Sequence, residues 1–172
     1  MVERFVVVPF GMHLLDGVLE AQKRSWNVTE NDLDRPNPEV PRWTPRRALR
    51  DLEKYLRERP ELFWVALDKT RGDVVGFVGY YPVDDKNWSL EGLDVVPEER
   101  RKGIGESLIR QVLRHAQHRE ARVVLRVRQD NLAAIRTYEK AGMRRTGREG
   151  KDLVYTSDYR KEVADPAAGI VA

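Results

Sequence analysis

A basic corner punctuated by glycine lies at residues 100–106, where the chain reads Arg-Arg-Lys-Gly-Ile-Gly-Glu and then takes on a helical pattern. The start of a helix offers main-chain N–H groups that lack an intrahelical acceptor, together with a partial positive charge. Glycine lets the main chain approach a ligand without interference from a Cβ atom. This combination is typical of a site that binds phosphate groups.

Two well-known phosphate motifs do not fit this corner. A P-loop requires the spacing G-x-x-x-x-G-K-[ST], which does not occur here. A Rossmann turn requires G-x-G-x-x-G directly after a buried strand. In this chain residues 97–102 separate Val96 from Gly103, and Leu108 stands where the third glycine would be. The simplest alternative is a surface turn that needs glycine only for its backbone geometry.

Composition narrows the class of protein. The 172 residues fit one domain, which we expect over 1–160, with a C-terminal tail over 161–172. Lys and Arg number 31 against 28 for Asp and Glu, and both signs are mixed along the chain, which does not indicate a nucleic-acid partner. The chain has no cysteine, which excludes disulfides, thiolate metal ligands and a cysteine-bound intermediate.

Targeting and metal signals are not found in the sequence. No run approaches the ~18 apolar residues of a membrane span. The first ten residues do not form a signal peptide, because their apolar run is short and Glu3 precedes it. No cluster has metal-ligand spacing. We therefore expect a cytoplasmic protein without a metal and without membrane contact.

The hydrophobic pattern predicts a mixed α/β fold with about four helices. Antiparallel strands come first and a β-α-β-α section follows, which differs from a regularly alternating doubly wound fold. Thr44 and Pro45 predict a helix start, and Gly142 predicts a helix end. The expected strands are 3–10, 62–68, 74–83, 87–96, 121–129 and 152–159; the expected helices are 12–24, 44–60, 104–116 and 130–143; a long loop is expected over 25–43.

Two segments carry a family resemblance. The stretch LDVVPEERRKGIG resembles motif A of the GNAT superfamily, the acyl-CoA-dependent N-acyltransferases. The stretch VRQDNLAAIRTYEKAGM resembles motif B of the same superfamily, and the element order agrees over 2–160. The matching positions are Pro97, Arg100, Gly103 and Gly105 in motif A, and Asn131, Ala134, Tyr138, Lys140, Gly142 and Met143 in motif B. The resemblance implies a GNAT fold, with a mostly antiparallel sheet that is splayed at the acyl-CoA site.

The resemblance also implies acetyl-CoA as cosubstrate and an acyltransferase activity. Main-chain N–H groups of Arg101–Glu106 would bind the CoA pyrophosphate, and we expect them to matter more than the Arg and Lys side chains. Asn131 would hydrogen-bond the pantetheine arm, cap its helix, or do both. The implied cofactor-binding residues are Val95, Val96, Arg100, Arg101, Lys102, Gly103, Ile104, Gly105, Glu106, Asn131 and Tyr138.

The implied reaction is transfer of the acetyl group to a primary amine. Without cysteine, the amine should attack the thioester directly in a ternary complex. The Val95 N–H would stabilise the carbonyl oxygen. Tyr138 would protonate the departing thiolate; its alternative role is that of a core aromatic beside Ile135.

The general base is less clear. Many relatives carry Glu at the position of Ser89, and Glu91 lies two residues further on the same face of the strand. Glu91 is therefore a candidate base, directly or through water, and the alternative is an exposed strand carboxylate. His13, His115 and His118 are poorer candidates, and the last two are predicted to be solvated.

The acceptor region is expected at residues 25–47 and 144–158. The first segment is acidic in its front half and carries tryptophans at both ends, which suits a cationic amine. A solvated loop anchored by tryptophan is an equal alternative. The identity of the amine stays open, and a homodimer is kept as a candidate assembly. The competing function is a non-catalytic acyl-CoA-binding module that acts as a sensor or interaction domain.

Overall fold

The structure is a computed structural model that describes residues 4–26, 40–158 and 160. Its contacts divide the chain into two compact units. The first unit comprises 1–79 and 92–105, and the second comprises 80–91 and 106–172. Three elements pass from one unit into the other, namely β3 (Val74–Pro82), β4 (Asn87–Val95) and α3 (Ile104–His118).

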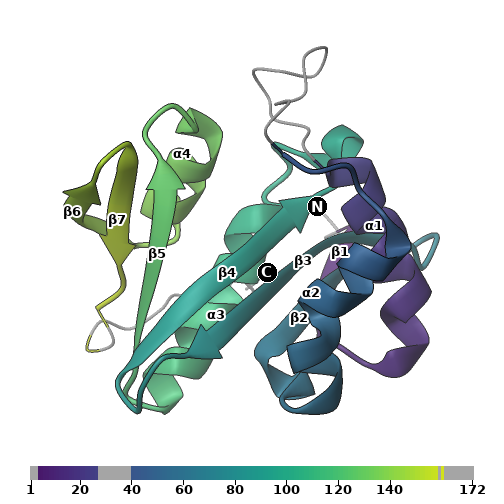
Figure 1. Cartoon of the computed structure of the whole chain (residues 1–172), viewed down its shortest axis with the longest axis horizontal. Helices are drawn as coiled ribbons and strands as arrows, with labels where there is room; N and C mark the ends of the chain where they lie inside the picture. Colours follow the sequence, from purple (N-terminus) through teal and green to yellow (C-terminus); the bar gives the residue numbers. More distant parts are fainter. Residues whose placement is uncertain (1–3, 27–39, 159, 161–172) are drawn as a thin grey trace, which may run out of the picture. The chain divides into compact units, whose positions relative to one another are not determined.

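Seven strands form a sheet in the order β1-β2-β3-β4-β5-β7-β6 (Figure 1). The remaining strands are β1 (Phe5–Pro9), β2 (Phe63–Asp68), β5 (Arg122–Arg128), β6 (Arg144–Glu149) and β7 (Asp152–Thr156). The pairs β1–β2, β2–β3, β5–β7 and β6–β7 are antiparallel, and β4–β5 is parallel. The predicted mixed, mostly antiparallel sheet is confirmed.

The described residues contain four α-helices, as the hydrophobic pattern predicted. Besides α3, they are α1 (Leu15–Ser25), α2 (Pro45–Arg57) and α4 (Leu132–Lys140), and short 3-10 turns lie at Met12–Leu14, Pro60–Leu62 and Pro97–Glu99. None of these helices has the length and apolar character needed to cross a membrane. Residues 27–39 and 161–172, which include most of the predicted loop and all of the predicted tail, lie outside the described residues.

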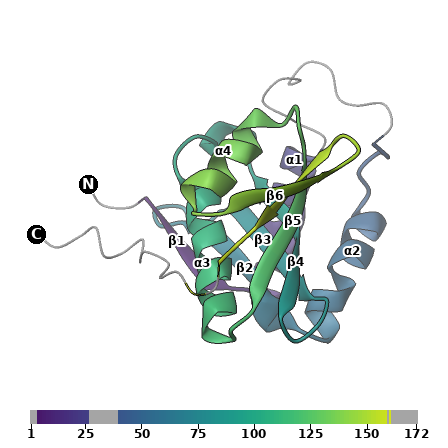
Figure 2. The same cartoon turned by 90° about the vertical axis from the view of Figure 1, so that its left-hand side faces the viewer.

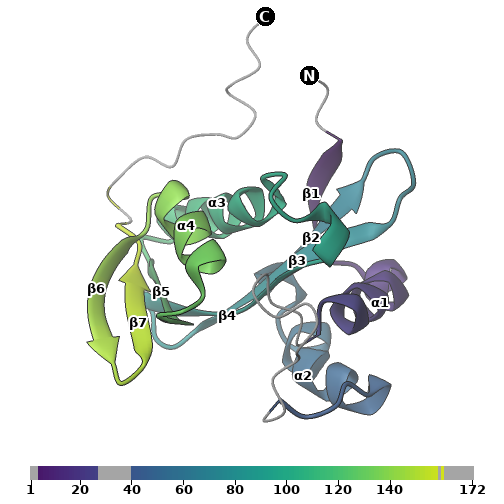
Figure 3. The same cartoon turned by 90° about the horizontal axis from the view of Figure 1, so that it is seen from above.

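The first unit packs α1 and α2 against one face of β1, β2 and β3 (Figure 3). The predicted cap of α2 is confirmed, because Thr44 Oγ1 accepts a hydrogen bond from the Arg47 N–H at 3.2 Å. Among the described side chains of α2, Ala48, Leu52 and Tyr55 form a buried stripe. This spacing places the three side chains on the one helix face that enters the core.

Tyr55 packs tightly into the first unit. Its side chain is 5% exposed, and its ring centroid lies 5.2 Å from that of Phe63. A Cβ atom added to Gly79 on β3 would lie only 2.8 Å from the Tyr55 ring. Burial raises the pKa of the Tyr55 hydroxyl to about 12. The absence of a side chain at position 79 therefore makes room for the tyrosine.

The second unit contains α4 and most of α3 (Figure 2), together with the strands β5, β7 and β6. Strand β7 lies between β5 and β6 (Figure 1). The apolar side chains of β5 alternate with exposed arginines, as its sequence predicted. Gly142 follows α4 with φ 96°, which confirms the predicted helix end. The predicted strand at 152–159 is observed as β7, which forms a hairpin with β6, and the turn between them includes Gly150 at φ 60°.

One side chain differs from its sequence prediction. His115 was predicted to be solvated, but it is half-buried, its ring centroid lies 5.4 Å from that of Trp88, and its Nδ1 is hydrogen-bonded to the Tyr80 hydroxyl. His118 is exposed, as predicted. Leu132, the first residue of α4, is 54% exposed.

Candidate functional site

The basic corner forms the entry to α3. After β4 the chain makes a short 3-10 turn at Pro97–Glu99 and reaches the helix at Ile104. In between, Arg101 has φ 59° and Gly103 has φ 82°, both in the left-handed region. This conformation is accessible to glycine and costs energy at arginine. A Cβ atom added to Gly103 would meet no atom within 4 Å, so position 103 borders open space.

Two of the three basic side chains in this loop are bound by the chain itself. Arg100 Nε donates to the Val95 carbonyl oxygen at 2.9 Å. Lys102 Nζ donates to the Glu98 carbonyl oxygen at 3.0 Å and to Glu99 Oε2 at 2.8 Å. Since these cations already have partners, the main-chain N–H groups at the start of α3 are the binding groups that the loop can offer to an anion.

The buried carboxylate of Glu99 holds this loop in place through ion pairs with three basic side chains. Its side chain is only 6% exposed, and Oε1 lies 3.5 Å from Nη2 of Arg4 and 3.5 Å from Nη2 of Arg71. The hydrogen bond from Lys102, followed by the charges of Arg4, Lys102 and Arg71, holds the pKa of Glu99 below its usual value. One buried carboxylate thus joins the loop to the residue before β1 and to the turn between β2 and β3.

Asp68 strengthens the same anchor. It is 2% exposed, and its Oδ1 accepts the main-chain N–H groups of Thr70 at 2.8 Å and Arg71 at 3.0 Å. These backbone hydrogen bonds, that of Arg71 first, lower the pKa of Asp68. Arg4 Nε donates to Asp68 Oδ2 at 3.2 Å, so Arg4 bridges the two buried carboxylates.

The end of β4 presents the predicted carbonyl-binding residue. The Val96 N–H donates to the Val75 carbonyl oxygen on β3 at 3.0 Å, so this N–H is used within the sheet. Successive residues of an extended chain direct their N–H groups to opposite sides. The Val95 N–H therefore points away from β3, which is the orientation that a donor to a bound ligand requires. The Val96 N–H does not have that orientation.

Asp94 is a candidate general base that the sequence motifs did not indicate. It lies half-buried on β4, directly before Val95. Burial raises the pKa of its carboxyl group, and a hydrogen bond with Ser25 and the charge of Arg100 oppose this effect. Ser25 is the last residue of α1 and is 4% exposed. A carboxyl group with a raised pKa can exchange protons nearer neutral pH than an ordinary aspartate can.

Ser89 and Glu91 lie in the second unit, on the first half of β4. The parallel pairing of β4 with β5 covers Asn87–Ser89 against Arg122–Val124 and goes no further along the two strands. Trp88 and Leu90 are buried, so alternation places Ser89 and Glu91 together on the other face. Glu91 is exposed and lies two residues beyond the last pair.

Helix α4 positions the motif B residues. Asn131 Oδ1 accepts a hydrogen bond from the Ala134 N–H at 3.2 Å, which confirms its role as the helix cap. Tyr138 is 7% exposed, and its ring centroid lies 6.3 Å from that of Tyr155. The Tyr155 hydroxyl donates to Glu139 at 2.8 Å, and burial, followed by Glu139, raises the pKa of that hydroxyl. The Tyr138 ring is therefore fixed by packing.

Arg110 connects two of the predicted elements within the second unit. Its Nε and Nη2 donate to Glu106 Oε1 at 3.1 and 2.9 Å, in the first turn of α3. The same Nη2 donates to the Lys140 carbonyl oxygen at 2.8 Å, at the end of α4. The Glu106 carboxylate is thus held by an arginine, and its main-chain N–H keeps its place in the helix start. Among the described residues, no group of three His, Asp or Glu side chains could hold a metal ion.

The chain is similar in sequence to known acetyltransferases. The model of the Acetyltransferase (GNAT) family matches residues 20–143. N-acetyltransferase family 8 member 3 of Mus musculus is 36% identical over 99 residues, which cover 54% of this chain and 43% of that protein. The chain's match thus spans less than half of that relative's length.

Two solved structures share the fold. One is the PaiA N-acetyltransferase of Thermoplasma acidophilum in complex with coenzyme A, with TM-score 0.65, 18% identity, and coverage of 90% of this chain and 99% of that one. The other is a GNAT-family acetyltransferase of Bacillus anthracis, with TM-score 0.69, 17% identity, and coverage of 94% and 98%. With the family match over residues 20–143, these findings establish that the chain belongs to the Acetyltransferase (GNAT) family.

Proposed function

We propose that the chain is an N-acetyltransferase that moves an acetyl group from acetyl-CoA to a primary amine in a ternary complex. The observation that carries this proposal is the loop at 100–105, in which Arg100 and Lys102 are bound to the chain itself and whose main chain leads into α3. Family membership supports the activity. The name of the mouse relative and the coenzyme A bound to the Thermoplasma protein support the same donor and reaction class.

The loop fits a pyrophosphate in its chemistry. The first N–H groups of α3 have no intrahelical acceptor, and the helix dipole favours negative charge at that end. Gly103 leaves open space beside them, in a conformation that other residues adopt only at a cost. Arg101, which is exposed, adds positive charge at the rim.

The orientation of the Val95 N–H would allow it to stabilise the transition state when the amine attacks the thioester. The amine nitrogen forms a bond to the thioester carbon, and the negative charge that develops on the carbonyl oxygen accepts a hydrogen bond from this N–H. A well-placed donor of this kind contributes about 3 kcal/mol to transition-state stabilisation. Collapse of the intermediate then breaks the C–S bond and releases the thiolate, to which Tyr138 donates its phenolic proton; solvent returns a proton to Tyr138.

Two carboxyl groups can take the proton of the attacking amine. Glu91 is exposed and, two residues after Ser89, lies on the same face of β4. Asp94 is half-buried next to Val95, and burial raises its pKa, which makes it a stronger base than an ordinary aspartate. We propose Asp94 as the base and retain Glu91 as the water-relay candidate. Activity against pH separates them: Glu91→Gln and Asp94→Asn should differ, and the base variant should recover at high pH, where free amine is abundant.

The phosphate site can be tested with a matched pair of glycines. Gly103 and Gly72 have φ 82° and 75°, and a Cβ atom at either position meets nothing within 4 Å. Alanine at each should therefore cost a similar ~1–2 kcal/mol of folding stability through backbone strain. Gly103→Ala should weaken CoA binding, measured by calorimetry, and Gly72→Ala, in the β2–β3 turn, should leave it unchanged. Equal CoA affinity in both variants would remove the loop from the binding site.

The non-catalytic alternative is separated from this proposal by turnover. A panel of amines with acetyl-CoA, followed by free thiol release, reports catalysis directly. CoA binding without thiol release on any amine would favour a sensor module. An acetylated enzyme that forms with acetyl-CoA alone and passes its acetyl group to an amine would rule out direct attack.

A further inference from the structure

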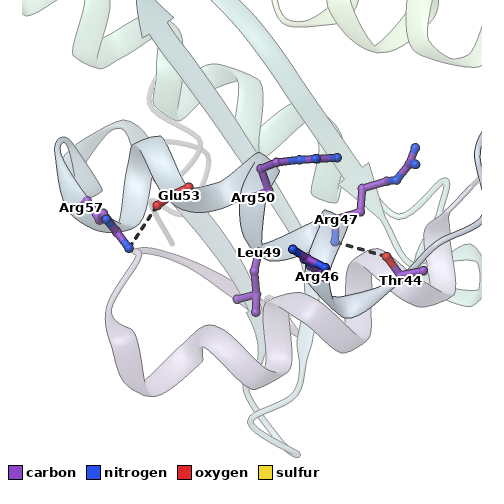
Figure 4. Close-up of a pocket in the computed structure, with 7 residues that line it drawn as sticks. All are labelled: Thr44, Arg46, Arg47, Leu49, Arg50, Glu53 and Arg57. Atoms are coloured by element: carbon purple, nitrogen blue, oxygen red, sulfur yellow. Dashed lines mark hydrogen bonds and ion pairs between the residues drawn. The ribbon is translucent and has the colours of Figure 1, made fainter.

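The outward face of α2 carries a concentration of positive charge away from the loop described above. Four arginines line a cavity of about 680 Å³ on this face (Figure 4). We refer to Arg46, Arg50 and Arg57 as the α2 arginine row; Thr44, Arg47, Leu49 and Glu53 complete the lining. The three members of the row are exposed.

Helix geometry places the row opposite the core. Arg50 lies four residues after Arg46, and Arg57 seven residues after Arg50, so all three fall on nearly the same side of the helix. The buried stripe of α2 lies on the other side. At 1.5 Å per residue, the row extends over about 16 Å. A row of this length exceeds the size of one small anion.

Two of the three charges of the row, those of Arg46 and Arg50, have no ion-pair partner within the described part of the chain. Arg57 pairs with Glu53, Nη2 to Oε1, at 3.1 Å, and both side chains are exposed, so this pair contributes little to stability. No ion pair with another described residue engages Arg46, Arg47 or Arg50. This differs from the loop before α3, where two of the three cations, Arg100 and Lys102, are bound to the chain.

The position of two arginines also opposes the stability of the helix. Arg46 and Arg47 stand in the first turn of α2, which contains no acidic residue. Cations at the positive end of a helix dipole are unfavourable, whereas acids there are favourable. Local choices that work against stability tend to gather at functional sites. The arginines are therefore better explained by a partner than by the folding of α2.

We infer that the α2 arginine row binds an extended acidic peptide segment of a partner protein. Arg46 and Arg50 are separated by about 6 Å along the axis, and alternate residues of an extended peptide by about 6.6 Å, so carboxylates at every second residue match successive turns. Guanidinium groups bind carboxylates in bidentate geometry. Leu49, 39% exposed, adds an apolar contact.

A peptide fits this face better than a nucleic acid does. Glu53 lies within the lining and would repel a phosphate backbone, whereas a basic or polar residue of a mixed peptide can face it. The chain as a whole carries a net charge of only +3 and has no basic stripe across its sequence. This surface is independent of the proposed catalytic reaction.

The test measures fluorescence anisotropy of a labelled ten-residue peptide that alternates glutamate and serine, at low and at physiological salt. The full chain should bind it, with an affinity that falls as salt rises. The double variant Arg46→Glu/Arg50→Glu should bind at least ~10-fold more weakly, because each lost charge-assisted contact contributes about 1.5–3 kcal/mol, and 1.4 kcal/mol corresponds to a factor of ten. Arg119→Glu, a charge reversal at an exposed arginine after α3, should change the affinity less than twofold.

Two results would overturn the inference. One is equal peptide affinity in the double variant and the wild type. The other is a labelled single-stranded oligonucleotide of the same length that binds more tightly than the peptide and is lost in the double variant. Folding is checked by the thermal transition, which should stay or rise because acids now stand at the helix start. CoA affinity should be unchanged in the double variant, so failure here is distinct from failure of the acetyltransferase proposal.

Discussion

The starts of α2 and α3 both lie in the first unit, both carry arginines, and they differ in what they offer to an anion. At α2 the main chain is used: Thr44 accepts the Arg47 N–H, and Pro45 has no N–H to give. The side chains of Arg46 and Arg47 in its first turn have no ion-pair partner among the described residues. At α3 the reverse holds, since Arg100 and Lys102 are bound to the chain and glycines flank the first N–H groups.

This difference indicates that a count of basic residues does not identify the kind of anion that a helix start recognises. Main-chain N–H groups are fixed by the helix and fit a compact, multiply charged group held close to the backbone. Free arginine side chains reach outward and adapt to a longer partner. The first arrangement suits a pyrophosphate, and the second suits an acidic segment.

The largest expected effect is the loss of kcat on substitution of Tyr138, the side chain that is proposed to protonate the CoA thiolate. Tyr138→Phe keeps the packed ring and removes the proton, so kcat should fall by about 100-fold, within the range of positioned general acids, with CoA affinity little changed. Tyr155→Phe is the matched control: it loses the hydrogen bond to Glu139 and should lower the thermal transition without a comparable loss of kcat. Wild-type turnover by Tyr138→Phe would leave Tyr138 as a core residue only.

A smaller effect is expected on CoA binding, where substitutions can separate the contribution of the main chain at the start of α3 from that of the Lys102 side chain. Gly105→Val places a branched side chain at the helix start and should raise the CoA dissociation constant by about 10–100-fold, the equivalent of one lost hydrogen bond to a charged group. Lys102→Ala should change it by less than about threefold, because Lys102 is already bound to Glu98 and Glu99. The opposite ranking in a calorimetric titration would contradict the main-chain assignment.

Breaking the anchor beneath the loop should have a moderate effect on stability. Glu99→Gln removes a buried carboxylate that holds Lys102, Arg4 and Arg71, at a cost of about 1–3 kcal/mol of unfolding free energy near pH 7. The folded-state pKa of Glu99 is lowered, so its stabilisation is present above the unfolded value of 4.5 and is lost as pH falls through the folded pKa. Urea unfolding of both proteins should therefore converge at acid pH; a constant difference down to pH 2 would contradict a charge-based role.

The smallest expected effect is that of Asp94→Asn, which should stabilise the fold, whereas Glu99→Gln should destabilise it. Burial raises the folded-state pKa of Asp94, so its contribution to stability is favourable below the unfolded value of 3.8 and is lost as pH rises through the folded pKa. Asp94→Asn should accordingly raise the thermal transition at pH 8, and the gain should shrink as pH falls toward 3.8. Activity should fall in the same variant. A stabilised variant with full activity would leave Asp94 without a role in catalysis.

Much of the fold could be predicted from local signals. Thr44 and Pro45 begin α2 as their chemistry requires, and Gly142 ends α4 in a left-handed conformation that glycine favours. β6 was harder to place: its six residues are Arg-Arg-Thr-Gly-Arg-Glu, nearly all exposed, so the sequence carries no apolar alternation there. Only its pairing with β7 makes it a strand.

Some residues of the candidate site could be predicted from the sequence and others could not, because only some of them depend on local backbone geometry. Glycines and motif spacing mark the loop before α3, because a backbone requirement leaves a visible trace in the sequence. Asp94 leaves no such trace, since its pKa depends on Ser25 and Arg100 and on the depth of burial. Likewise, the contacts of His115 with Tyr80 and Trp88 come from strands that are distant in sequence. Tertiary neighbours decide these cases.

The fit between Tyr55 and Gly79 bears on how this family can change over evolutionary time. A Cβ atom at position 79 would collide with the tyrosine ring, whose place among Phe63 and the buried stripe of α2 leaves it little freedom to move. Alanine at 79 should therefore be acceptable only in relatives that have a smaller residue at 55. The two positions should covary across an alignment, and the order of the substitutions along a lineage should be the smaller residue at 55 first and the larger one at 79 second.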